Sequence, residues 1–154
     1  MEFRIPEPLQ VEHEELHATL AQATKEPGEV GNAAREVARL LHPHFVAEEE
    51  FALPPLALLA VLAGGPVTPE MAAVLPMTRR LKTELPKMLA EHQRIVGALE
   101  KLRAAAQAAG RAEYESFARA LVLHARTEEQ VLYPAAILVG EHVERSLREP
   151  AAIH

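Results

Sequence analysis

The chain carries one short pattern twice, and this duplication constrains the fold more than any other feature of the sequence. Residues 44–55 read HFVAEEEFALPP and residues 124–135 read HARTEEQVLYPA, so each segment places a glutamate four positions after a histidine and soon reaches a proline. A second pair repeats nearly in step, because residues 11–16 read VEHEEL and residues 90–95 read AEHQRI. The offsets are 80 and 79 residues. The chain therefore contains two copies of one pattern: a histidine on a first helix and an HxxxE motif on a second.

The length of 154 residues predicts a single domain, residues 1–154, with an internal pseudo-repeat of residues 9–55 and 88–135. The absence of cysteine excludes thiolate metal sites, disulfides and a cysteine nucleophile. A net charge of -6 argues against a nucleic-acid or anionic-membrane partner. The longest apolar stretch, residues 54–66, is too short to span a bilayer, and the initial MEFRIPEP lacks the pattern of a secretory signal. We therefore expect a cytoplasmic protein.

Apolar residues recur at alternating spacings of four and three along four long stretches, which is the pattern of amphipathic helices. Aromatic residues make up only 4% of the chain, and strand-like runs of β-branched residues are missing. The predicted helices span residues 6–24, 32–53, about 86–109 and 111–133. Helices with such apolar seams specify an all-α fold, an antiparallel four-helix bundle.

The remaining segments contain several prolines, which help to define where helices begin and end. A short helical insertion, residues 56–63, is expected between the second and third helices, and a short C-terminal helix over residues 135–148. Pro76 and Pro86 argue against one continuous helix across this part of the chain, and Pro43 is expected to kink the second helix.

Polar residues interrupt the apolar seam of each predicted helix. They are His13, His44, Glu48, His92, His124 and Glu128. One histidine on an apolar stripe is more often a hydrogen-bonded core residue than a metal ligand. A buried carboxylate, by contrast, costs several kcal/mol unless it is paired or neutralised. Because no arginine or lysine lies on the seams, the missing positive charge is most simply a metal cation.

The spacing of these residues suits a pair of ions. Residues four apart lie on one face of a helix, so His44 with Glu48, and His124 with Glu128, can reach neighbouring cations. Imidazole and carboxylate without sulfur suit iron, manganese or zinc. Two six-coordinate ions offer roughly twelve positions, and four imidazoles, two bridging carboxylates and a bridging oxo or hydroxo group leave about two of them open. A further ligand, His17, would leave one, and an open position is what admits a small ligand.

At these residues the sequence resembles the hemerythrin-like family, also called HHE cation-binding domains. The resemblance implies an up-down-up-down bundle with a non-haem di-iron centre bridged by two glutamates. It assigns the ligands to His13, His44, Glu48, His92, His124 and Glu128. Oxygen-carrying hemerythrins have a further histidine one turn beyond the ligand of the third helix, where this chain has Val96. Here the extra histidine, His17, follows His13 on the first helix instead, either as a ligand of the other metal or as a hydrogen-bonding group.

Other polar residues receive simpler interpretations. Glu49 and Glu129 are expected to be partners of the ligand histidines or solvated charges. Glu12 and Glu91, which precede ligand histidines, are interpreted as surface charges, and His42 as a group on the helix surface.

Three classes of function remain to be compared. The leading hypothesis is a di-iron protein that binds or reacts with a small oxidant such as dioxygen, peroxide or nitric oxide, including the variant of a di-iron oxidoreductase. No catalytic residue outside the cluster can be named. The alternative is a metal-dependent sensor or iron-handling module that acts through an unidentified protein partner without turnover. A phosphotransfer bundle needs one exposed histidine among basic and small residues, whereas these histidines lie on apolar seams in duplicate.

Overall fold

The computed structural model describes residues 1–149, and within them every regular element is a helix. The elements are α1 (Glu7–Thr24), α2 (Gly28–Ala47), the π-helix η1 (Glu48–Ala52), the 3-10 helix η2 (Pro54–Leu58), α3 (Leu59–Gly64), the 3-10 helix η3 (Pro69–Val74), α4 (Leu75–Ala108), α5 (Ala112–Thr127), the π-helix η4 (Glu128–Leu132) and α6 (Tyr133–Arg148). The all-α prediction is confirmed.

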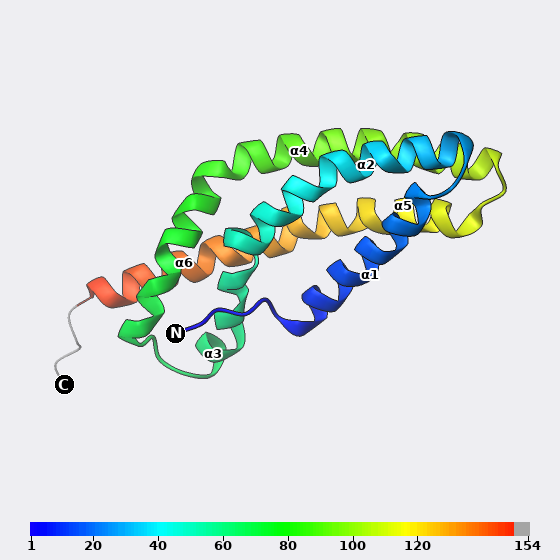
Figure 1. The fold of residues 1–154 in the computed structure, drawn as a ribbon. Helices are drawn as coiled ribbons and strands as arrows, with labels where there is room; N and C mark the ends of the chain where they lie inside the picture. The colour runs from blue at the N-terminus through cyan, green and yellow to red at the C-terminus, as the bar shows by residue number, and fades with distance from the viewer. Residues whose placement is uncertain (150–154) are drawn as a thin grey trace.

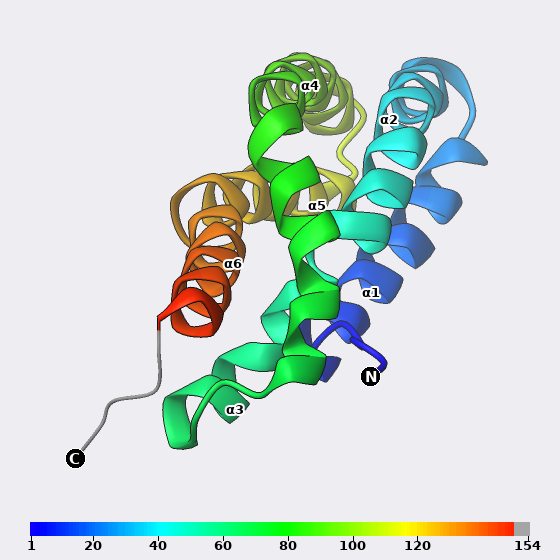
Figure 2. The same cartoon turned by 90° about the vertical axis from the view of Figure 1, so that its left-hand side faces the viewer.

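Four long helices lie side by side and form the bundle (Figure 1). α1 packs on α2 and α5, and α4 also packs on α2 and α5, so the order around the bundle is α1, α2, α4, α5. α6 continues from α5 beyond η4, and α3 lies at the same end of the bundle (Figure 2). In the described part of the chain, no helix is both long and apolar enough to cross a bilayer.

The opposite end of the bundle is closed by two turns that contact each other. Gly28 and Gly110 each adopt a φ of 69°, the left-handed conformation that glycine tolerates best. Between the turns, the guanidinium group of Arg111 pairs with Glu26. The hydroxyl group of Tyr114 donates to the same carboxylate at 3.1 Å. These contacts join the α1–α2 turn to the α4–α5 turn and so fix the far end of the bundle.

The structure corrects one prediction about the prolines. α4 runs without a break from Leu75 to Ala108, through the region where Pro76 and Pro86 were expected to interrupt it. Pro76 lies in the first helical turn, where its missing N–H has no intrahelical partner to lose. Pro86 lies inside the helix, where proline can be accommodated by a kink, and α4 bends in its first half (Figure 1). α2 likewise begins at Gly28, four residues earlier than predicted.

Both HxxxE motifs lead into a π-helical segment, which sequence patterns did not predict. The N–H of Leu53 donates to the carbonyl of Glu48 at 2.9 Å, and the N–H of Tyr133 donates to the carbonyl of Glu128. Each segment is followed by proline, which lacks an N–H and clashes with the carbonyl four residues earlier in a regular α-helix. The wider π turn relieves this clash in both halves, and such turns are frequent at functional sites.

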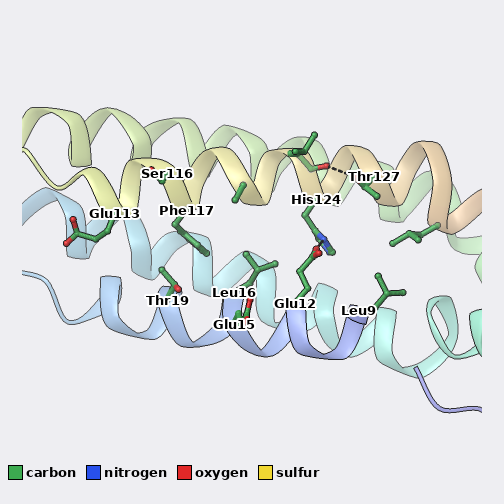
Figure 3. A pocket seen from close by; sticks show the side chains of 13 residues that line it. Leu9, Glu12, Glu15, Leu16, Thr19, Glu113, Ser116, Phe117, His124 and Thr127 are labelled. Carbon is green, nitrogen blue, oxygen red and sulfur yellow. Dashed lines mark hydrogen bonds and ion pairs between the residues drawn. The ribbon is translucent and has the colours of Figure 1, made fainter. Parts of the chain in front are cut away.

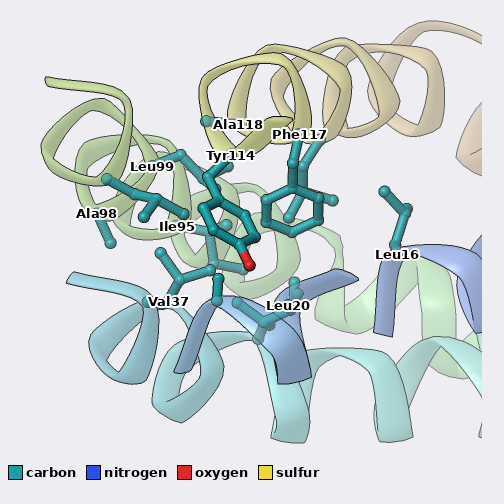
Figure 4. Close-up of a cluster of buried hydrophobic side chains, with 14 of the residues drawn as sticks. Leu16, Leu20, Val37, Ile95, Ala98, Leu99, Tyr114, Phe117 and Ala118 are labelled. Atoms are coloured by element: carbon teal, nitrogen blue, oxygen red, sulfur yellow. The ribbon is translucent and has the colours of Figure 1, made fainter. Parts of the chain in front are cut away.

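The apolar core is divided by a polar layer. On the side toward the paired turns, α1, α2, α4 and α5 contribute Leu20, Val37, Leu99, Phe117 and their neighbours (Figure 4). On the other side a second apolar cluster includes Phe51, Met88 and Tyr133. Six of the predicted histidines and glutamates, all except His17, are buried in this layer, so the fold surrounds them with apolar side chains.

Candidate metal centre

The structure brings six of the seven predicted ligands together in the interior. Their exposed fractions are 2% for His13, 1% for His44, 0% for Glu48, 2% for His92, 6% for His124 and 1% for Glu128. α1, α2, α4 and α5 each contribute one histidine, and η1 and η4 each contribute one glutamate. Each helix of the bundle therefore presents an imidazole to the same polar layer.

The side chains divide into two groups that share Glu128. One group consists of His44, His92 and Glu128 and the other of His13, His124 and Glu128, each with one potential ligand atom per residue within 4.8 Å of the others. Glu128 Oε1 lies 3.2 Å from His92 Nε2, and its Oε2 lies 3.2 Å from His124 Nε2. A carboxylate that offers one oxygen to each group has the arrangement of a bridge between two cations.

Glu48 lies beside His44 and Tyr133 and is not shared by the two groups. Its Oε1 lies 3.3 Å from His44 Nε2, and its Oε2 accepts a hydrogen bond of 3.0 Å from the Tyr133 hydroxyl.

In the part of the chain that the structure describes, several polar atoms of the cluster have no hydrogen-bond partner within reach, and others face each other closely. His13 Nε2 and His124 Nε2 face each other at 3.2 Å. Within residues 1–149, three atoms of the cluster are buried without a hydrogen-bond partner: Glu48 Oε1, Glu128 Oε2 and His44 Nδ1. Unpaired buried acceptors are costly, and a cation at their focus would satisfy several of them at once.

Burial also disfavours protonation of the imidazoles. Loss of hydration lowers the pKa of all four histidines, and nearby imidazoles help to lower that of His44 to about 3. The same loss of hydration raises the pKa of Glu48 well above its ordinary value. Neutral imidazoles are the form that binds a metal ion. The interior therefore keeps these four residues ready to bind without a competing proton.

The Nδ1 atom of each buried imidazole faces a carboxylate. His92 Nδ1 lies 2.9 Å from Glu129, His44 Nδ1 lies 3.5 Å from Glu91, His13 Nδ1 lies 3.8 Å from Glu49, and His124 Nδ1 contacts Glu12. Of the two residues expected to be either partners of these histidines or solvated charges, Glu129 is hydrogen-bonded to His92, whereas Glu49 is 44% exposed and lies farther from His13. Glu12 and Glu91 are partly exposed, at 47% and 21%, as their interpretation as surface charges requires, but each also faces an imidazole of another helix, which only the folded chain brings near.

His17 lies outside the cluster. Its side chain is exposed, and its ring centroid is 4.9 Å from that of Phe45, which stacks on His13 at 4.3 Å. A surface hollow of about 310 Å³ is lined by His17 and by His42, which is also exposed. The ring of Phe45 therefore lies between His17 and the buried imidazole one turn earlier.

Tyr133 belongs to the cluster although the ligand motifs did not include it. The side chain is fully buried, and its hydroxyl lies 3.2 Å from His92 Nε2 and 3.3 Å from His44 Nε2. The sequence carried one signal, because Leu53 occupies the matching position in the first half of the repeat. The tyrosine thus adds an oxygen atom to one group of the cluster and makes the two halves chemically unequal.

Two cavities adjoin the polar layer. An internal cavity of about 10 Å³, roughly what one water molecule needs, is lined by His44, His92 and Glu128 and by apolar residues that include Phe45. A larger groove of about 550 Å³ lies between α1 and α5 (Figure 3). Glu12 reaches across this groove from α1 toward His124, so the carboxylate stands between solvent and that imidazole.

Four helices that direct four imidazoles and two carboxylates, one of them shared by both groups, into one buried layer define a metal-cation-binding helical bundle. The family model of the hemerythrin HHE cation-binding domain matches residues 5–136, and it matches residues 83–152 a second time. The chain therefore belongs to the hemerythrin HHE cation-binding domain family. None of the curated proteins or solved structures compared with the chain matches it.

Proposed function

We propose that this protein holds a carboxylate-bridged pair of iron ions and binds or reacts with a small oxidant there, such as dioxygen, peroxide or nitric oxide. The observation that carries the proposal is the position of Glu128, whose two oxygens each lie 3.2 Å from the Nε2 atom of a histidine in a different group. The nitrogen and oxygen donors, without sulfur, suit iron and also permit manganese or zinc. An oxo or hydroxo group would complete the bridge.

Different residues of the chain would hold the ions and control access to them. The four imidazoles would hold the ions, Glu128 would join them, and Glu48 would add a carboxylate on the side where Tyr133 donates a hydrogen bond. When bound, the ions supply Lewis-acid and redox chemistry. The apolar residues around the internal cavity exclude bulk water. A cavity of about 10 Å³, close to what one water molecule needs, favours a very small ligand over an organic substrate.

Metal content of single variants tests the proposal. Glu128→Ala should prevent the stable binding of two ions, because it removes an oxygen from both groups, and Glu48→Ala should do so by removing the second carboxylate. His42→Ala is the matched control, since this histidine is exposed and lies two residues from the ligand His44. Equal metal content in the three variants would contradict the site.

A second measurement separates the two classes of function. Rapid, repeated consumption of peroxide or nitric oxide by the iron-loaded protein would identify an oxidoreductase. Stoichiometric and reversible spectral changes on addition of the same molecules would identify a binding or sensing protein.

A further inference from the structure

Four partly exposed glutamates follow one rule: each lies within 4.0 Å of the Nδ1 atom of a histidine on a neighbouring helix. Glu12 on α1 contacts His124 on α5, Glu129 after α5 contacts His92 on α4, Glu91 on α4 faces His44 on α2, and Glu49 after α2 faces His13 on α1. The direction α1 to α5 to α4 to α2 and back to α1 closes around the bundle. We call Glu12, Glu49, Glu91 and Glu129 the glutamate ring.

We propose that the glutamate ring positions the four metal-binding imidazoles, so that each helix orients the ligand of the next. This inference rests on the proposed metal centre. Glu129 is hydrogen-bonded to His92 Nδ1 at 2.9 Å, and a carboxylate that accepts from Nδ1–H fixes the tautomer and the ring orientation, which leaves the Nε2 lone pair directed inward. Glu12 contacts His124 Nδ1 in the same way. Glu91 and Glu49 lie 3.5 Å and 3.8 Å from Nδ1 of His44 and His13, beyond a normal hydrogen bond, so they would act through their charge. A hydrogen-bonded carboxylate also makes the imidazole a stronger ligand, and loss of such a partner commonly weakens metal binding by about 10–100-fold.

The partners of the ring glutamates distinguish this role from that of ordinary surface charges. In residues 1–149, the ion pairs within 4.0 Å give no ring glutamate an arginine or lysine partner. The neighbouring Glu50, by contrast, pairs with Arg80, and Glu115 on α5 pairs with Arg119. The ring is also partly exposed, from 21% for Glu91 to 47% for Glu12, so its charges remain hydrated while they contact buried imidazoles.

The closest contacts in the ring serve different groups of the cluster. Glu129 contacts His92 at 2.9 Å, and His92 belongs with His44. Glu12 contacts His124, which belongs with His13 (Figure 3). Loss of either carboxylate should therefore loosen one ion of the pair more than the other.

Release of iron to a chelator tests the ring. Protein loaded with two equivalents of iron is mixed with an excess of chelator, and release is followed by absorbance. In Glu129→Ala and in Glu12→Ala, one equivalent should leave about 10–100 times faster than from the wild-type protein. Glu129→Gln should restore part of the lost retention, because the amide oxygen still accepts from Nδ1–H. Glu50→Ala, which removes a glutamate from the same π-helical segment as Glu49, should release both ions at the wild-type rate.

A spectroscopic measurement isolates positioning from general stability. In the diamagnetic zinc-loaded protein, the Nδ1–H proton of His92 should give a slowly exchanging downfield resonance that is lost in Glu129→Ala and kept in Glu50→Ala. The role of the glutamate ring alone would be overturned by one result. In it, the wild type binds two ions, and Glu129→Ala and Glu12→Ala release them at the same rate as Glu50→Ala. A wild-type protein that binds no metal would overturn the proposed function and the ring together.

Discussion

Glu48 and Glu128 occupy equivalent positions in the two halves of the repeat, yet their surroundings differ because of one hydroxyl group. Tyr133 donates to Glu48 at 3.0 Å and is fully buried, whereas the matching residue of the first half is Leu53, which offers no polar atom. Burial raises the pKa of the Tyr133 phenol, and the nearby Glu48 carboxylate adds to the effect. The phenol therefore stays protonated in the metal-free protein and acts there as a hydrogen-bond donor.

Tyr133→Phe should therefore destabilise the metal-free protein. Removing the hydroxyl leaves Glu48 Oε2 buried without its donor, which costs about 1–3 kcal/mol. Tyr114→Phe is the matched control, because Glu26 keeps its ion pair with Arg111 when the Tyr114 hydroxyl is lost, and the cost should stay below about 1 kcal/mol. Urea unfolding of the metal-free variants measures both values, and equal losses would contradict this role of Tyr133.

The stability of the metal-free protein should depend on pH with two opposite trends. The folded-state pKa of each buried histidine lies below the ordinary 6.5, reaching about 3 for His44, so the unfolded chain binds more protons and stability falls as pH drops below 6.5. Glu48 behaves oppositely, since its raised pKa makes stability fall as pH rises above 4.5. Each group contributes a slope of up to about 1.4 kcal/mol per pH unit.

The free energy of unfolding, measured by urea titration between about pH 4 and pH 8, checks both trends. Because four histidines oppose one glutamate, stability in the wild type should still rise between the two ordinary values, reach its maximum near or just above pH 6.5, and decline at higher pH. Glu48→Gln should remove the decline on the alkaline side and retain the decline on the acid side. A flat profile in the wild type would show that the buried groups titrate as they do in the unfolded chain.

The elements show which parts of the site a sequence can specify. Heptad seams and the duplicated HxxxE motif identified the six buried residues, because both features depend on residues of one helix. The contacts of Glu12 and Glu91 were not predictable in this way, since their partners lie on other helices and depend on how the helices pack. Tyr133 was missed because a π turn, η4, precedes it and changes the direction in which it projects relative to a regular helix.

Packing of α6 against α4 also determines the position of Tyr133, the first residue of α6. A Cβ atom added at Gly140 would overlap the side chain of Thr78 on α4. Gly140→Ala should therefore separate the two helices and cost about 1–3 kcal/mol. In the described chain, a Cβ atom added at Gly97 meets nothing within 4 Å, so Gly97→Ala should instead stabilise α4 by about 0.5–1 kcal/mol. Thermal unfolding shows whether each variant melts at a lower or a higher temperature than the wild type. Melting temperatures that change in the same direction in both variants would contradict this packing.

At the scale of the whole molecule, the stability of the fold should depend on how the negative charges of the candidate metal centre are compensated. Glu48 and Glu128 lie in the interior of a chain with a net charge of -6, and the glutamate ring surrounds them. In residues 1–149 none of these six carboxylates has an arginine or lysine partner within 4.0 Å. The bundle therefore brings together acids that repel one another unless cations lie between them.

Removal of the metal should accordingly lower the free energy of unfolding by several kcal/mol at neutral pH, because the ligands are then buried without partners. Glu128→Leu should change the stability of the metal-free protein in the opposite direction. This variant replaces a buried acid with an apolar side chain, so its metal-free form should be more stable than the metal-free wild type while iron adds little to it. Thermal unfolding of both proteins, with iron and after chelation, measures the four values. Equal melting of the wild type in both states would mean that these acids are compensated in some way other than by bound cations.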